Sequence, residues 1–312
     1  MNTLVTGAAG FVGKKVVQNL LERGNGVVAT DQKFTEPPTS SALTLLPGDL
    51  ADDAFRQTLF DQDIDNVIHL AAVPGGTAEA NPALSLRINV EATIDLMMRA
   101  GQNKNQCRFV YASSIAVLGD PLPKDGVDDE TPLKPTLYYG MHKQMAEIAL
   151  ATLSRRNIID GVGLRLPGIV ARPAGATGLK SAFMSNLFHA LLAGDDFICP
   201  VSAQAGVWIM SLSQVATNLV HTLDLNSQEM PADRSVTLPA IHCQMGDVID
   251  AVARKVQADT KTVTFDQDVE LEKAFGACPP LTADNAKRAG FADDGTLDQL
   301  VDRVIADIQH HD

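Results

Sequence analysis

The feature that most constrains the fold of this chain is a glycine-rich segment near its start, GAAGFVG at residues 7–13. A short apolar run at residues 2–6 precedes it and predicts a buried strand, while apolar residues at helical spacing follow at 11–21. A strand, a glycine turn and a helix in this order form the context in which a dinucleotide-binding fingerprint occurs. The segment therefore predicts a Rossmann-type fold at the N-terminus.

Each glycine of this segment has a physical task. Gly7 permits the tight turn, Gly10 lets the backbone approach a pyrophosphate, and Gly13 lets the helix pack closely on its strand. We expect Phe11 and Val12 to contact the cofactor too, because they open the helix whose N-terminus points at the phosphates. A side chain at position 10 should block the cofactor.

Short apolar runs alternate with helical stretches along the first half of the chain. The runs that predict further strands lie at residues 26–30, 43–46, 63–70, 108–112 and 161–166. The helical stretches between them lie near residues 52–61, 83–101 and 137–155. This alternation predicts an α/β fold with a doubly wound parallel sheet.

The pattern changes after Leu166, where prolines and glycines crowd a loop before a helical stretch at 181–192. We expect the chain to enter a smaller C-terminal substrate lobe at this loop and to return to the main sheet later. Further helical patterns, assigned to the lobe or its edge, lie at 245–256 and 297–308. The predicted domains are a Rossmann domain over 1–172, completed by about 207–238, and a smaller lobe over 173–206 and 239–312.

Charge and composition exclude several classes of function. The 312 residues are 45% hydrophobic and 20% charged, as in ordinary globular proteins. The formal net charge of −13 gives nucleic acid or an anionic membrane surface little to attract. No apolar run approaches the length of a membrane span, and the N-terminus runs into the first strand without a signal segment. We therefore expect a cytoplasmic protein.

The cysteines give no sign of a metal site. They lack a CxxC pair and regular histidine spacing, and they are scattered over Cys107, Cys199, Cys243 and Cys278. We interpret them as buried free thiols, and we expect no metal.

Asp31 indicates which nicotinamide cofactor the chain prefers. It ends the second predicted strand, eighteen positions after Gly13. A carboxylate there accepts hydrogen bonds from the adenosine ribose hydroxyls and repels a 2′-phosphate. NAD is therefore favoured over NADP, with Lys33 as the one nearby cation that tempers this preference.

Two further strand ends complete the predicted cofactor site. Asp49, followed by Leu50, comes after the third strand, where it can meet the adenine ring from the side. His69 ends the fourth strand and is interpreted as a hydrogen-bonded core histidine. The residues that then pass beside the flat cofactor are Leu70, Ala71 and Ala72.

A Ser, Tyr and Lys set predicts the chemistry. Tyr139 and Lys143 are four apart in a helical stretch, so their side chains share one face. An ammonium near a phenol lowers its pKa and makes it a base for a substrate alcohol near neutral pH. Ser114 follows the strand at 108–112 at the carboxyl edge, where open α/β sheets bind ligands, and its hydroxyl can orient the reacting oxygen. This set, with the fingerprint, predicts hydride transfer.

With these motifs, the sequence resembles the extended short-chain dehydrogenase/reductase superfamily, often called the NAD-dependent epimerase/dehydratase family. The resemblance covers most of the chain. Its motifs are GAAGFVG at 7–13, HLAA at 69–72, YASSIAVLG at 111–119, YYGMHK at 138–143 and LRLPGIV at 164–170.

The resemblance implies roles for these residues. Tyr139 is the expected acid/base, Lys143 bridges the ribose, and Ser114 polarises the substrate oxygen. Ser113 and Pro167 are expected beside the nicotinamide.

Asn89 is also expected among the cofactor contacts. The resemblance further implies a homodimer, formed through a four-helix bundle that is built from the helices near 89–101 and 137–155.

Two departures from the family's patterns bear on the reaction. Ile115 and Ala116 follow Ser114, where the dehydratases carry an Asp-Glu pair, so elimination of water is not expected. Residues 167–173 replace the asparagine and the Tyr-Gly-Pro turn that help nucleotide-sugar enzymes hold the nucleotide.

A nearer resemblance is to the D-erythronate dehydrogenase group. It rests on SSIAVLGDPLP at 113–123, SRRNIIDGVGLRLPGIVARP at 154–173, CP at 199–200 and VW at 207–208. It implies NAD-dependent oxidation of a small sugar acid at its 2-hydroxyl, D-erythronate to 2-dehydro-D-erythronate.

A hydroxy acid needs a cation for its carboxylate. Arg172 follows the sixth predicted strand into the second lobe and is the first candidate, with Lys180 as the alternate. An ion pair at the surface or between the lobes is the other interpretation of Arg172. Trp208 either closes one wall of a small pocket or serves in packing.

Two other functions remain open. A nucleotide-sugar epimerase would return the hydride to the other face and release no net NADH. A protein that binds NAD without chemistry would keep the Rossmann pocket alone.

Overall fold

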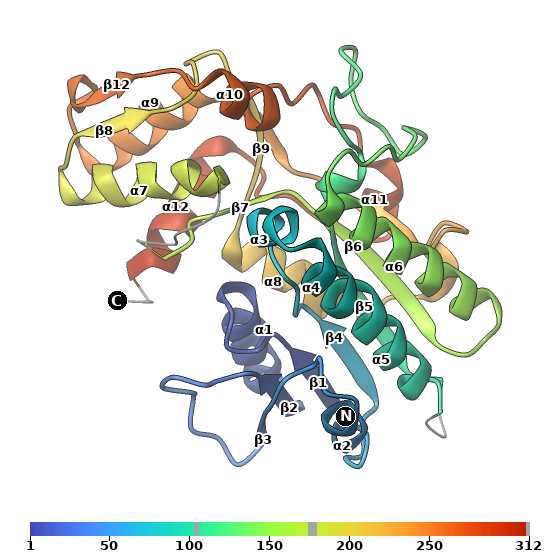
Figure 1. Ribbon diagram of the computed structural model, residues 1–312. Coiled ribbons are helices and arrows are strands. Elements are labelled where there is room, and N and C mark those ends of the chain that lie inside the picture. Colours follow the sequence, from blue (N-terminus) through green and yellow to red (C-terminus); the bar gives the residue numbers. More distant parts are fainter. Residues whose placement is uncertain (103–105, 174–179, 310–312) are drawn as a thin grey trace.

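A seven-stranded parallel sheet forms the centre of the computed structural model, which describes residues 1–102, 106–173 and 180–309 (Figure 1). Its strand order is β10-β6-β5-β4-β1-β2-β3. The strands are β1 (Asn2–Thr6), β2 (Gly26–Asp31), β3 (Leu43–Pro47), β4 (Asn66–His69), β5 (Arg108–Ser114), β6 (Asp160–Leu166) and β10 (Ser235–Thr237). The predicted doubly wound α/β fold is confirmed.

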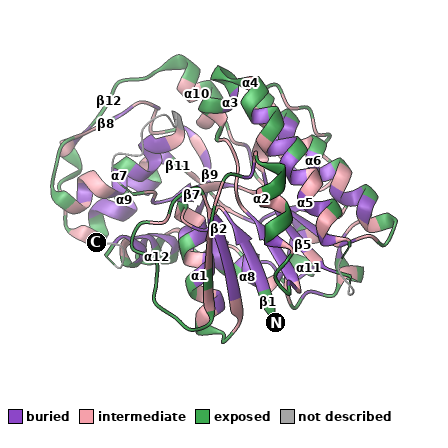
Figure 2. Ribbon diagram, turned by 60° about the horizontal axis from the view of Figure 1, so that its bottom comes forward, coloured by how far each residue is buried: buried purple, intermediate pink, exposed green. Residues whose placement is uncertain are grey.

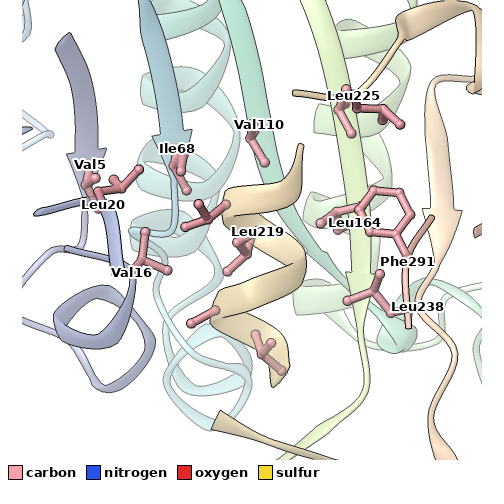
Figure 3. Packing of buried hydrophobic residues seen from close by; sticks show 14 of the residues in the cluster. Val5, Val16, Leu20, Ile68, Val110, Leu164, Leu219, Leu225, Leu238 and Phe291 are labelled. Atoms are coloured by element: carbon pink, nitrogen blue, oxygen red, sulfur yellow. The ribbon is translucent and has the colours of Figure 1, made fainter. Parts of the chain in front are cut away.

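The central strands are mostly apolar, and successive side chains point to opposite faces of the sheet, so both faces are buried. Leu4 packs toward helices α5 and α6, while its neighbour Val5 packs toward α1 and α8. Figure 3 shows Val5 with Val16, Leu20 and Leu219 on that second face. The helices are α1 (Phe11–Glu22) and α8 (Leu212–His221) on one face, and α5 (Thr93–Ala100) and α6 (Tyr138–Arg155) on the other.

Short elements connect the longer strands and helices in this half of the chain. Before α5, the chain passes through a π-helical segment, which often marks a functional site. These elements are α2 (Asp53–Leu59), α3 (Gly75–Ala80), α4 (Pro82–Leu86), the π-helix η1 (Arg87–Ala92) and the 3₁₀ turn η2 (Ile115–Val117).

A second group of elements lies beyond the carboxyl edge of the main sheet (Figure 1). It contains a three-stranded sheet, β11-β9-β7, and a two-stranded sheet, β12-β8. Its strands are β7 (Gly168–Val170), β8 (Phe197–Cys199), β9 (Gly206–Ser211), β11 (Ile241–Gln244) and β12 (Val263–Phe265). Its helices are η3 (Lys180–Ala182), α7 (Phe183–Ala193), α9 (Met245–Val256), η5 (Thr260–Thr262), α10 (Val269–Phe275) and α12 (Leu297–Gln309).

This second group has an apolar core of its own, and Figure 2 shows buried residues on the inner sides of α7 and α9. Residues 207–238, expected to return to the main sheet, do so only in part. β9 pairs with β7 and β11, whereas α8 covers the main sheet and β10 pairs with β6 after the 3₁₀ turn η4 (Ser227–Glu229).

The C-terminal part of the chain is shared between the two cores. Ala283, Ala286 and Phe291, on and beside α11 (Asp284–Arg288), pack with the core of the main sheet. α12 packs with the core of the second group. The division into domains at the predicted boundaries stays a prediction.

Candidate active site

The glycine-rich turn between β1 and α1 is packed too closely to accept side chains. Gly7 has a φ of +69°, and a Cβ there would lie 2.8 Å from the Ala71 backbone nitrogen. At Gly13, a Cβ would lie 2.1 Å from the Gly7 carbonyl oxygen. These contacts explain why two of the three glycines are needed even before a ligand is considered.

The turn leaves room for a phosphate above Gly10. A Cβ at Gly10 would approach only the Gly7 carbonyl oxygen, at 3.1 Å, among the described atoms. Gly10 is also the N-cap of α1 and, within the described residues, no side chain caps this helix end. The free N–H groups of the first turn can therefore bind an anion, which fits the pyrophosphate of a dinucleotide.

Asp31 lies at the end of β2, beside the same turn. One of its carboxylate oxygens accepts a hydrogen bond from Ala9 N at 3.0 Å, and the other accepts from Gln32 N at 2.8 Å. The carboxylate is thereby held at the carboxyl edge, where ribose hydroxyls can donate to its remaining lone pairs. Lys33 is exposed on the following turn.

The third strand end offers one exposed carboxylate. Asp49 is exposed and accepts a hydrogen bond from Ala51 N, while Leu50 packs into the core beneath α5 and α6. Asp49 is therefore the polar group that this strand end presents to solvent.

His69 is a core histidine, as expected. Its two ring nitrogens bond the hydroxyls of Thr6, at 2.7 Å, and Thr93, at 2.9 Å. Burial, together with the nearby charge of Lys143, lowers the pKa of His69 to about 3, so the ring is neutral at pH 7.

The segment after β4 is held by Asn89 on η1. The Asn89 amide accepts from Val73 N at 2.7 Å and donates to Val73 O at 3.0 Å. It also donates to Ser85 Oγ, which bonds His142 on α6. Asn89 thus fixes the backbone beyond Leu70, Ala71 and Ala72.

Tyr139, Lys143 and Ser114 come together where β5 meets α6. Lys143 is buried and donates to the Ala112 carbonyl at 2.7 Å, and its Nζ lies 5.6 Å from the centre of the Tyr139 ring. The Ser114 and Tyr139 side chains are hydrogen-bonded. Ser114 Oγ also accepts from Ala116 N, which fixes it at the start of η2.

The charge of Arg172 acts on the pKa of the Tyr139 phenol. Burial raises this pKa above its ordinary value, and the Arg172 charge and the hydrogen bond with Ser114 oppose the rise. The same role for Lys143, which the sequence suggests, stays a prediction. Burial lowers the pKa of Lys143 to about 7, with Glu147 acting in the opposite direction, so Lys143 is only partly charged near neutral pH.

Arg172 reaches this cluster from the loop after β7. Its guanidinium carbon lies 5.6 Å from the centre of the Phe11 ring, at the start of α1. The side chain therefore lies beside the glycine-rich turn, and its charge acts on Tyr139. A phenol, a hydroxyl, an ammonium and a guanidinium around one space can bind an anionic alcohol and remove its proton.

This geometry agrees with the comparison of the sequence with protein families, in which residues 3–205 match the NAD dependent epimerase/dehydratase family. The chain belongs to this family. NAD is therefore the cofactor, and its binding by the glycine-rich turn and Asp31 stays a prediction.

Relatives within the family match the chain over nearly its whole length. The D-erythronate dehydrogenase of Cupriavidus necator is 32% identical, and the match covers 98% of each chain. The D-erythronate dehydrogenase of Haemophilus influenzae is 27% identical over 98% of this chain and 99% of its own.

Solved structures show the same fold. A crystal structure named as a nucleoside-diphosphate-sugar epimerase from Agrobacterium tumefaciens is 28% identical, with a TM-score of 0.91 over 100% of this chain and 95% of that one. A GalE-like L-threonine dehydrogenase from Cupriavidus necator, in its holo form, has a TM-score of 0.88 at 20% identity, over 99% of this chain and 100% of its own.

Ser113 does not face the site as expected. Its hydroxyl donates to Glu147 on α6, at 2.5 Å, and is 2% exposed. Successive strand residues point to opposite faces, so Ser113 turns toward the core when Ser114 turns toward Tyr139. Its hydroxyl therefore ties β5 to α6, and a contact of Ser113 with the nicotinamide stays a prediction.

Glu147 and Arg165 are the pair that the sequence analysis missed. They form a buried ion pair, at 2.8 Å between Arg165 Nη2 and Glu147 Oε2, which joins α6 to β6. Glu147 lies one helical turn after Lys143, and this spacing was the only signal in the sequence that could have found it.

The structure describes the side chain of one predicted substrate residue, Trp208, but not that of another, Lys180. Trp208 is 2% exposed, packs against Leu118 and Val127, and donates its indole N–H to Pro279 O at 2.7 Å, so it serves in packing and forms no pocket wall. The side chain of Lys180 lies outside the described residues. Pro167 lies between β6 and β7, at the carboxyl edge.

A cavity of about 910 Å³ lies between the glycine-rich turn and α7. Phe11 and Lys14 line it from α1, and Pro173 and His189 line it from the loop and from α7.

None of the helices in the described part of the chain has the length and the apolar character that a membrane span requires. The same residues contain no cluster of side chains that could hold a metal ion. All four cysteines, which lie in the described ranges, are free thiols.

Proposed function

We propose that the protein oxidises the 2-hydroxyl of a four-carbon sugar acid with NAD, converting D-erythronate to 2-dehydro-D-erythronate. The observation that carries this proposal is the position of the Arg172 guanidinium, which lies 5.6 Å from the centre of the Phe11 ring and is close enough to Tyr139 for its charge to act on the phenol. In a 2-hydroxy acid the carboxylate and the reacting carbon are adjacent, so a substrate needs a cation and a base side by side. Full-length relatives named D-erythronate dehydrogenase support the same substrate.

The roles of the residues follow from this pairing. Arg172 holds the carboxylate, and Ser114 orients the 2-hydroxyl by hydrogen bonding. Tyr139 takes the hydroxyl proton as the carbon–oxygen bond becomes a carbonyl, and NAD, when bound, accepts the hydride that leaves the carbon. Lys143 contributes positive charge beside the phenol in its protonated fraction.

An epimerase is the second candidate, because a solved structure 28% identical to this chain carries that name. The two reactions differ in their products. A dehydrogenase releases NADH, whereas an epimerase returns the hydride and shows no net reduction of NAD.

The test is the formation of NADH by the purified protein with NAD and a panel of D-erythronate, L-threonate, L-threonine, simple alcohols and UDP-sugars. We expect reduction with a four-carbon sugar acid. Tyr139→Phe should keep its affinity for NAD and lose nearly all turnover, by at least about 100-fold. Interconversion of a UDP-sugar without net NADH would overturn the proposal, and binding of NAD without any turnover would indicate a non-catalytic protein.

We also infer that two copies of the chain associate through α5 and α6. We propose the cytoplasm as the location of the protein. Met141, Met145 and Ile148 lie on one side of α6 at helical spacing, and Met98 on α5 is exposed too. These residues are 39%, 40%, 60% and 44% exposed, respectively. Two copies that bury this surface would form a bundle of four helices.

A further inference from the structure

Arg172 is held in place by helix α7. Its backbone N–H donates to Ser185 Oγ at 3.0 Å, and its carbonyl accepts from His189 Nε2 at 2.7 Å. Ser185 and His189 are four residues apart, so they lie on the same side of α7 and bind the same residue from both ends. The two bonds fix the peptide groups on either side of the Arg172 Cα.

The direction of the Arg172 side chain depends on these peptide groups. The guanidinium extends over the Phe11 ring, at 5.6 Å, and its charge acts on Tyr139. A rotation of the backbone at residue 172 would move the guanidinium by several ångströms, because a long side chain amplifies changes at its base. Charge-assisted, bidentate binding of a carboxylate tolerates little such displacement.

We propose that Ser185 and His189 are positioning residues, which aim Arg172 at the substrate carboxylate and so make the enzyme selective for acids. This inference rests on the proposed function. Ser185 is 2% exposed and belongs to the core, whereas His189 is partly buried and lines the cavity beside Phe11 and Pro173. His189 can therefore be changed with less effect on the fold.

The test compares D-erythronate with its neutral amide, D-erythronamide, as substrate or as competitive inhibitor. His189→Leu removes the donor to the Arg172 carbonyl and keeps an apolar side chain. We expect KM for D-erythronate to rise about tenfold, with a smaller change in kcat, because a charge-assisted contact is weakened. The values for the amide and the Kd for NAD should stay within about twofold of the wild type.

His189→Gln is the matched control, because its amide nitrogen can donate where Nε2 does. We expect it to restore KM for D-erythronate to near the wild-type value. Ser185→Ala should raise the same KM without changing the Kd for NAD. Recovery by glutamine separates a specific hydrogen bond from a general loss of packing.

Equal losses for the acid and the amide in His189→Leu, or a weaker Kd for NAD, would overturn the inference. Unchanged kinetics for D-erythronate in His189→Leu would overturn it as well, and would leave the proposed function intact. A wild-type protein that oxidises no sugar acid would instead overturn both.

Discussion

At the scale of single residues, the phenol of Tyr139 is the group whose titration controls the proposed reaction. Burial raises its pKa, whereas the Arg172 charge and the hydrogen bond with Ser114 lower it. Oxidation of an alcohol needs the deprotonated phenol as base, so kcat for oxidation should rise with pH as Tyr139 loses its proton.

Arg172→Gln should move this rising limb to higher pH. The substitution removes the cation that lowers the pKa of Tyr139, so a more alkaline solution is needed to form the phenolate. The measurement is the pH profile of kcat at saturating D-erythronate. Arg156→Gln, a change at an exposed arginine at the end of α6, should leave the profile unchanged. A limb that stays in place in Arg172→Gln would show that the guanidinium does not act on the phenol.

At the scale of elements, α6 is tied to its neighbours by polar contacts on both sides. On one side, Glu147 binds Ser113 on β5 and Arg165 on β6. On the other, His142 bonds Ser85, which bonds Asn89. The helix that carries Tyr139 and Lys143 is thereby fixed to the sheet and to the segment that follows β4.

Glu147→Gln should lower the free energy of unfolding by about 3–5 kcal/mol, because it leaves the charge of Arg165 buried without its partner. Asp233, whose side chain is 58% exposed, also contacts Arg165 but at 3.3 Å. The measurement is denaturation in urea at pH 7.

Arg254→Gln is the control for this prediction. It breaks the Arg254–Asp298 ion pair, which is exposed on both sides, and should change stability by less than about 1 kcal/mol. Equal effects of the two substitutions would contradict the role assigned to the buried pair.

At the scale of the whole molecule, the proposed site lies between two separate apolar cores. Tyr139, Lys143 and Ser114 belong to the main sheet and α6, while Arg172 is held by α7 of the second group. The proposed base and the cation proposed to bind the substrate carboxylate therefore come from different parts of the molecule. Substrate selectivity can then change with the second group while the cofactor turn stays the same.

Ile148→Glu should convert the proposed dimer into a monomer. It places a charge on the exposed apolar surface of α6, at its most exposed residue, where burial against a second copy would be costly. Analytical ultracentrifugation measures the change in mass. Ile198→Glu alters a residue of β8 that is 63% exposed, away from α6, and should leave the mass as in the wild type. A monomeric wild-type protein would rule out the bundle.

Much of the fold could be predicted because it depends on local patterns. Apolar periodicity identified the strands of the main sheet other than β10, and the glycines at 7, 10 and 13 identified the turn between β1 and α1. The spacing of Tyr139 and Lys143 placed both on one face of α6. The catalytic and cofactor roles of these residues stay predictions.

The sequence by itself therefore determined the Rossmann architecture, the family and NAD, because these depend on residues a few positions apart along one strand, turn or helix. Only the tertiary structure decided that Ser113 faces Glu147, that β9 leaves the main sheet, and that the charge of Arg172 acts on Tyr139. These facts depend on which face of an element is buried and on contacts between distant segments. Such contacts exist only when the chain has packed.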